Sequence, residues 1–265
     1  MAKTVGLTTI AVTDHDTLGG VREAMNAGQN LGVEVIPGIE ISCVIERGQC
    51  HMLGLFIDPD SATLNHKLQE LQDARRARND ALVTRLNDLG IPFTLDEAIV
   101  FAGRDLVARP HFARALVARG VVSTLQEAFD RYLAEGAAAS VPKEKLSPQQ
   151  GIEMIKEAGG LAILAHPNNL RLPFDETLQA LLRMKDVGLD GYEARYNSHT
   201  AEETDRYLQF AVSHGFVTAG GSDFHGPTVK PNIKLGEVEC GRPAPAEMLT
   251  DLKAFKRTRN ELLQH

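Results

Sequence analysis

Four apolar, strand-like runs in the sequence each end in side chains that bind divalent metal ions. These side chains are His15, Glu40, His166 and the pair Asp223 and His225. Strands of a barrel or of a doubly wound α/β sheet end at a common edge, so residues far apart in the sequence converge there. No cysteine accompanies the set. We therefore expect a metal centre built from nitrogen and oxygen ligands.

Each of these side chains also has an ordinary structural interpretation. Asp223 and His225 could belong to a turn rich in glycine and serine, although in an extended segment both would point toward one metal cluster. A histidine at the end of a buried strand, such as His166, is more often a core residue. Glu40 interrupts an apolar run, where a carboxylate is costly unless it is paired or bound to metal. The metal interpretation therefore depends on the set as a whole.

His51, at the start of a further apolar run, extends the set to four histidines and two carboxylates. These six residues exceed the three or four ligands of one catalytic zinc ion, so we expect two or three divalent ions. Mn²⁺ fits the ligands best, Zn²⁺ and Fe²⁺ fit as well, and Mg²⁺ is less favoured because of the imidazoles. Such a cluster generates hydroxide near neutral pH and binds phosphate oxygens, so phosphoester hydrolysis is the favoured reaction.

Alternating strand and helix signals surround these residues and predict an α/β fold with a largely parallel sheet. The expected strands cover residues 8–13, 33–37, 39–45, 50–57, 161–165, 191–194 and 216–220. We expect a helix over residues 18–31 that ends at Gly32, and Asp16 or Thr17 could cap its start. Pro148 suits the first turn of another helix.

Residues 64–140 differ, because leucines recur there at helical spacing and no convincing strand interrupts them. The sequence therefore predicts an all-helical insertion over residues 64–140 between the two parts of an α/β domain, residues 1–63 and 141–265.

Composition sets wide limits on the function. The 265 residues carry a net charge of -7, which argues against a broad nucleic-acid-binding surface and against stable DNA binding. No apolar stretch approaches the length of a membrane span, and no secretory signal is seen. Cys43, Cys50 and Cys240 form no zinc-type pair, so we expect a reduced, cytoplasmic protein. Cys43 and Cys50 could be redox partners, but two half-buried thiols on neighbouring strands are the preferred interpretation.

The ordered motifs resemble a known family. TDHDT, PGIEIS, the run that carries His51, ILAHP and GGSDFHG follow the order seen in PHP (polymerase and histidinol phosphatase) domains. RPHFARAL and GYEARYNSHT resemble the TrpH/RNase AM subgroup, whose members are metal-dependent phosphoesterases of nucleotides and RNA 5′ ends. The resemblance implies a distorted seven-stranded β/α barrel with a helical insertion. It also implies that Glu40 bridges two metal ions.

The same pattern distributes the remaining ligands. His51 and His166 would complete one metal site, Asp223 would bind a second ion, and His15 with His225 would bind a third. The family's opening strand, with its His-x-His motif and a following Ser-Asp-Gly, has no counterpart in this sequence. One barrel strand, two histidine ligands and one aspartate ligand are thus expected to be missing, through a start codon placed too late or a truncated product, with reduced activity as the consequence.

Substrate-side residues carry weaker signals. Arg109 is expected to hold a phosphate group, and a salt bridge at a helix start is nearly as good an interpretation. His199 follows an expected strand and would contact phosphate or protonate the leaving group. Glu193 is expected inside the barrel or behind the metal ligands. A basic helix face, expected to be solvated, carries Arg75, Arg76, Arg78 and Arg85.

Together these features predict a metal-dependent phosphoesterase in which His15, Asp223 and His199 are catalytic. Its substrates would be 3′,5′-nucleoside bisphosphates or the 5′ ends of short RNA, with no membrane partner. Two alternatives remain open. One is a phosphatase of another small phosphorylated metabolite, and the other is a catalytically impaired chain that only binds phosphorylated ligands.

Overall fold

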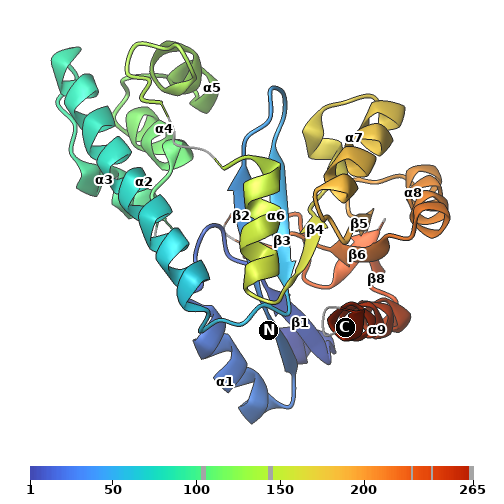
Figure 1. Cartoon of the computed structure of the whole chain (residues 1–265). Helices are drawn as coiled ribbons and strands as arrows, with labels where there is room; N and C mark the ends of the chain where they lie inside the picture. The colour runs from blue at the N-terminus through green and yellow to red at the C-terminus, as the bar shows by residue number, and fades with distance from the viewer. Residues whose placement is uncertain (103–105, 143–145, 228, 240, 263–265) are drawn as a thin grey trace. The chain divides into compact units, whose positions relative to one another are not determined.

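The computed structural model describes the chain except for residues 103–105, 143–145, 228, 240 and 263–265 (Figure 1). Cys240 and His265 thus lie outside the described residues. The chain forms two compact units, Met1–Lys67 with Lys145–His265, and Leu68–Glu144. The first unit contains an α/β sheet, whereas the second is helical.

A curled sheet of six strands, in the order β1-β2-β3-β4-β5-β6, forms the centre of the first unit (Figure 1). The strands are β1 (Thr9–Val12), β2 (Glu34–Cys43), β3 (Cys50–Leu55), β4 (Leu161–Leu164), β5 (Gly191–Tyr196) and β6 (Val217–Gly221). β3 runs antiparallel to both of its neighbours, and the other pairings are parallel. The sheet is a half-barrel, which agrees with the expected α/β class. A seventh strand and a missing first strand stay predictions.

β2 is one continuous strand, so the expectation of separate strands over residues 33–37 and 39–45 is wrong. Its first half pairs with β1 as far as Pro37, and its second half pairs with β3 from Gly38 onward. Proline has no backbone donor for a strand ladder. Pro37 is tolerated here because it lies where β2 changes partners, and its carbonyl still accepts from Ile57 N–H at 3.2 Å.

The two faces of β2 and β3 have different environments. One face packs against α6 (Pro148–Glu157), where a methyl group added to Gly151 would lie 2.6 Å from Cys43 Sγ and 3.6 Å from a methyl carbon of Ile41. Side chains alternate between the faces of a strand. Glu40 and Ser42 therefore point to the opposite face, together with His51, which lies across from Ser42.

Apolar side chains fill the rest of this opposite face, beginning with Leu53, which lies directly across from Glu40. Leu53, Ile163 and Val217 pack there with Leu252 of α9 (Ala246–Leu262). The remaining helices of the unit are α1 (Val21–Leu31), α7 (Phe174–Asp186) and α8 (Ala201–His214), with short 3₁₀ turns at Ala2–Val5 and Pro167–Leu170. A separate two-stranded ribbon pairs β7 (Glu237–Glu239) with β8 (Arg242–Pro243).

Most expected helix ends are observed, with one exception. Gly32 ends α1 in the left-handed conformation, and Pro148 begins α6 behind its N-cap, Ser147. The expected cap at Asp16 or Thr17 is wrong, because α1 begins at Val21 after Gly20 and no side chain caps it. The Asp16 carboxylate instead accepts from Ser42 N–H at 2.9 Å, so it joins the end of β1 to β2.

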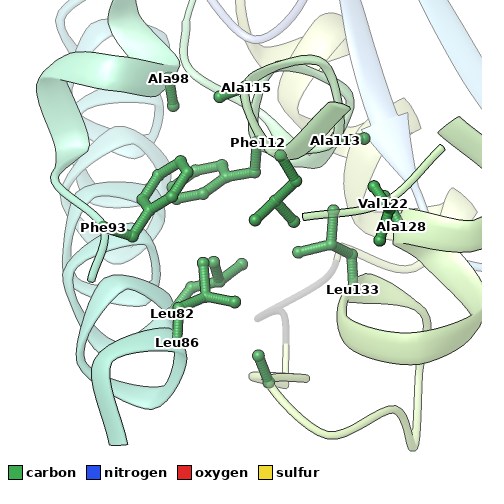
Figure 2. Close-up of a cluster of buried hydrophobic side chains, with 12 residues drawn as sticks. Leu82, Leu86, Phe93, Ala98, Phe112, Ala113, Ala115, Val122, Ala128 and Leu133 are labelled. Atoms are coloured by element: carbon green, nitrogen blue, oxygen red, sulfur yellow. The ribbon is translucent and has the colours of Figure 1, made fainter. Parts of the chain in front are cut away.

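The helical unit has a core of its own (Figure 2). Phe93 and Phe112 stack with ring centroids 5.5 Å apart, and Leu82, Leu86 and Leu133 are buried around them (Figure 2). Its elements are the later turns of α2 (Ala62–Asp88), α3 (Leu95–Ala102), α4 (Arg109–Ala118), α5 (Leu125–Ala128) and a π-turn at Phe129–Leu133. Within the described residues, no helix of either unit is long and apolar enough to cross a membrane.

Candidate metal centre

Three of the expected ligands meet at the first three strands. Glu40 lies within β2, His15 forms an isolated bridge with it just beyond β1, and His51 lies in β3. Their ligand atoms lie within 4.8 Å of one another. His51 Nδ1 is 2.8 Å from Glu40 Oε1, and His15 Nε2 is 3.7 Å from Glu40 Oε2. This spacing suits one divalent ion.

His166 joins the group through an unusual backbone conformation. Strand alternation would turn its side chain to the face of Leu164, away from Glu40. His166 has a φ of 30°, however, which is rare for a residue with a Cβ and turns the chain at the end of β4. Its Nε2 consequently lies 3.2 Å from both Glu40 Oε1 and His51 Nδ1. The predicted position at a strand end is correct, but its direction depends on this turn.

Glu40 is a buried carboxylate among imidazoles. Burial alone would raise the pKa of Glu40, but hydrogen bonds from His166 and His51 hold its pKa far below the usual range. Burial also lowers the pKa of His15, although Glu40 opposes this effect. A carboxylate together with imidazole nitrogens is the donor set that Mn²⁺, Zn²⁺ and Fe²⁺ prefer. These residues therefore fit the metal that the sequence implies.

Asp223 and His225 lie at the end of β6, as expected, but they are not extended. Asp223 has a φ of 53°, and its backbone carbonyl accepts from His225 Nδ1 at 2.9 Å. The argument that an extended segment aligns the two side chains is therefore wrong. They meet through a turn instead, with His225 Nδ1 3.3 Å from Asp223 Oδ1. The His225 and His15 rings are 5.8 Å apart, so the pair borders the Glu40 group.

A second layer of polar groups supports the ligands. Glu193 of β5 is buried, as expected, and accepts from His166 N–H at 2.7 Å. Burial raises the pKa of Glu193 to about 7. The Asn169 amide lies 3.0 Å from His166 Nδ1, and the Tyr196 hydroxyl donates to Asp223 Oδ2 at 3.0 Å. Such groups fix the orientation of ligands in metal sites.

Several known proteins are similar to this chain in fold and in sequence. No protein-family model matches the chain. A protein from Bifidobacterium adolescentis assigned as a metal-dependent phosphoesterase superposes with a TM-score of 0.76 at 31% identity, covering 96% of this chain and 88% of the other. The 5′-3′ exoribonuclease Rnm of Salmonella typhimurium is 33% identical over 230 residues, which are 86% of this chain and 78% of the relative. This chain belongs to the PHP family of metal-dependent phosphoesterases.

A second PHP relative is a 3′,5′-nucleoside bisphosphate phosphatase from Chromobacterium violaceum. It is 31% identical over 219 residues, which are 82% of this chain and 77% of the relative. The names of these relatives describe hydrolysis of phosphoester bonds, so the predicted reaction class and family are confirmed.

The substrate-side residues of this PHP chain lie in different environments. Arg109 begins α4 in the helical unit, and its guanidinium donates to the Leu133 carbonyl at 3.2 Å. His199 is 2% exposed and packs between the rings of Tyr196 and Tyr207. Its Nδ1 lies 3.1 Å from the Ala194 carbonyl, which fixes the ring, and burial lowers its pKa. The substrate roles of Arg109 and His199 stay predictions.

Two polar residues were missed or misjudged from the sequence. Arg78, expected on a solvated face, is 8% exposed, and its Nε has no partner among the described residues. Burial and the nearby charges of Arg75 and Arg109 lower the pKa of Arg78 to about 10. Lys230 was not singled out, yet its ammonium lies 2.5 Å from Asp223 Oδ2. Neither position has a sequence signal, because burial and pairing arise here from tertiary contacts.

Proposed function

We propose that this PHP protein hydrolyses phosphate esters of 3′,5′-nucleoside bisphosphates or of RNA 5′ ends with the help of two or three divalent ions, Mn²⁺ fitting best. The observation that carries the proposal is the buried Glu40 carboxylate surrounded by three imidazoles at 2.8–3.7 Å. The bisphosphate phosphatase and exoribonuclease relatives supply the substrate class.

The proposed ligands are His15, Glu40, His51, His166, Asp223 and His225. A divalent ion held by them would lower the pKa of a water molecule and neutralise charge on the phosphoryl oxygens. The protein's own contribution is preorganisation. Glu193 and Asn169 fix His166, and Tyr196 fixes Asp223, so these ligands need little rearrangement when an ion binds.

Arginine side chains in the helical unit favour an anionic substrate. A buried guanidinium usually pairs with a carboxylate, but within the described residues no carboxylate pairs with Arg78, whose charged neighbours are Arg75 and Arg109. Planar guanidinium groups recognise phosphate by paired hydrogen bonds. We propose that Arg78 and Arg109 bind a phosphate of the substrate, and that His199 supports the site from its buried position.

Phosphate release tests this function. The purified chain would be stripped of metal, supplied with Mn²⁺ and given adenosine 3′,5′-bisphosphate or a 5′-phosphorylated RNA oligonucleotide. We expect Mn²⁺-dependent turnover, and Glu40→Gln should lower it by more than about a hundredfold because a neutral amide is a poor metal ligand. Glu46→Gln is the matched control, since Glu46 is exposed in the loop between β2 and β3.

The outcome also separates the alternatives. No turnover of either substrate at saturating Mn²⁺ would contradict the proposal. Turnover of histidinol phosphate or a sugar phosphate alone would support a phosphatase of another small metabolite. Binding of nucleotide without any turnover would support a chain that only binds phosphorylated ligands.

A further inference from the structure

We propose that Lys230 competes with a divalent ion for the Asp223 carboxylate and must be displaced before that ion can bind. The inference rests on the proposed function, because it concerns how the same site takes up metal. Its consequence is that the two halves of the site load with unequal affinity, the Glu40 half first and the Asp223 half second.

The partners of Asp223 carry the argument. Lys230 Nζ lies 2.5 Å from Asp223 Oδ2, and the Tyr196 hydroxyl donates to the same oxygen at 3.0 Å. His225 Nδ1 lies 3.3 Å from the other carboxylate oxygen. A divalent ion at Asp223 and the Lys230 ammonium would thus compete for the same carboxylate, and the two positive charges would repel each other strongly at that distance.

The Glu40 half offers a contrast. Among the described residues, the ion pairs of Glu40 are with three histidines. An imidazole binds a metal ion through a nitrogen lone pair, so metal binding there would release at most protons and would break no ion pair with a lysine or arginine. A divalent ion can therefore bind between His15, Glu40 and His51 without displacing a cation. Among the described residues, a lysine pairs with Asp223, whereas no lysine or arginine pairs with Glu40.

The backbone brings Lys230 to this position. Lys230 N–H donates to the Gly226 carbonyl at 3.0 Å, and Val229 N–H donates to the same carbonyl at 3.2 Å, so a turn folds the chain back after β6. The Lys230 side chain is about one-third exposed, whereas Lys234 on the same loop is 75% exposed and pairs with Glu237. Lys234 therefore offers a control with the same charge and no contact with Asp223.

Calorimetric titration of the metal-stripped protein with Mn²⁺ tests the inference. We expect a tighter and a weaker binding event in the wild type. Lys230→Met should strengthen the weaker event by about tenfold or more, because the ion no longer has to break a charge-assisted hydrogen bond. Lys230→Arg should keep the weaker event weak, since a guanidinium also pairs with a carboxylate. Lys234→Met should leave both events unchanged, and thermal unfolding without metal would verify that each variant is folded.

The outcomes separate this inference from the proposed function. The role of Lys230 would be overturned if Lys230→Met and Lys234→Met changed both events equally, or if Lys230→Met made the weaker event weaker still. Neither result would affect the proposed function. A folded wild type that binds no Mn²⁺ would overturn both proposals. A tenfold gain confined to the weaker event in Lys230→Met is the result that supports the inference.

Discussion

The two ends of the candidate metal centre differ in the groups that compensate the charge of their carboxylates. Glu40 is stabilised in its ionised form by imidazoles, whereas Asp223 is paired with an ammonium group. We expect a metal ion to bind Glu40 directly, whereas at Asp223 it would first have to displace the Lys230 ammonium. The orientation of the proposed ligands depends on neighbouring side chains, as His166 shows. Its backbone N–H is held by Glu193, and its Nδ1 faces Asn169.

We expect Asn169 to hold the His166 ring so that Nε2 is the nitrogen that binds metal. The Asn169 side-chain nitrogen Nδ2 lies 3.0 Å from His166 Nδ1, and this contact holds the ring with Nε2 directed to Glu40 and His51. Asn169→Ala should therefore weaken Mn²⁺ binding by about tenfold, since outer partners of metal ligands contribute about 10–100-fold in affinity. Calorimetric titration would measure the change.

The neighbouring Asn168 provides the control for this prediction. Its side chain accepts from the Tyr207 hydroxyl at 3.1 Å and makes no bond to a proposed ligand, so Asn168→Ala should leave the Mn²⁺ affinity unchanged. An equal loss in both variants would show that Asn169 supports the local fold and not the ligand.

At the scale of elements, the ends of the strands decide where the side chains point. Asp16, His166 and Asp223 all have positive φ, and they follow β1, β4 and β6. Such conformations cost about 1–3 kcal/mol each for residues with a Cβ and cluster at functional sites. The sheet fixes the positions of the three ends, and these turns then direct polar groups to one face.

Close packing of β5 against β6 supports this arrangement. A methyl group on Gly191 would lie 1.9 Å from the Val217 carbonyl oxygen, which is backbone and cannot swing away. Gly191→Ala should therefore lower the free energy of unfolding by about 3 kcal/mol, as measured by urea denaturation.

Gly19→Ala is the matched change without this clash. The nearest atom to the added methyl group would be Thr17 Oγ1 at 3.4 Å, so the free energy of unfolding should change by less than about 0.5 kcal/mol. Equal stability of the two variants would mean that β5 and β6 can separate without cost.

At the scale of the molecule, the first unit is closed by contacts between distant parts of the sequence. Asp190, just before β5, accepts from Lys156 of α6 at 2.6 Å and from Arg259 of α9 at 3.0 Å. Arg259 also donates to the Gly160 carbonyl at 2.7 Å. One buried carboxylate thus joins α6, α9 and the sheet.

Removing the Arg259 charge should loosen this junction. Arg259→Met leaves Asp190 with one cationic partner and removes the donor from the Gly159 and Gly160 carbonyls, so the free energy of unfolding should fall by about 3 kcal/mol. Arg257→Met, on an exposed position of the same helix, should have little effect. Urea denaturation of both variants would measure the difference, and equal midpoints would contradict a structural role for Arg259.

The sequence alone predicted most strand positions, the residue types of the proposed metal ligands and the family. Alternation of apolar and polar residues places Glu40 and His51 on one face, and a strand end can be read from its apolar run and its flanking glycine or proline. The tertiary structure decided the rest. Positive φ at His166 and Asp223 directs their side chains. Tertiary packing buries Arg78, and a turn brings Lys230 to Asp223. These features depend on contacts between residues distant in the chain or on backbone strain that the whole fold must support, and neither leaves a local pattern of residue types.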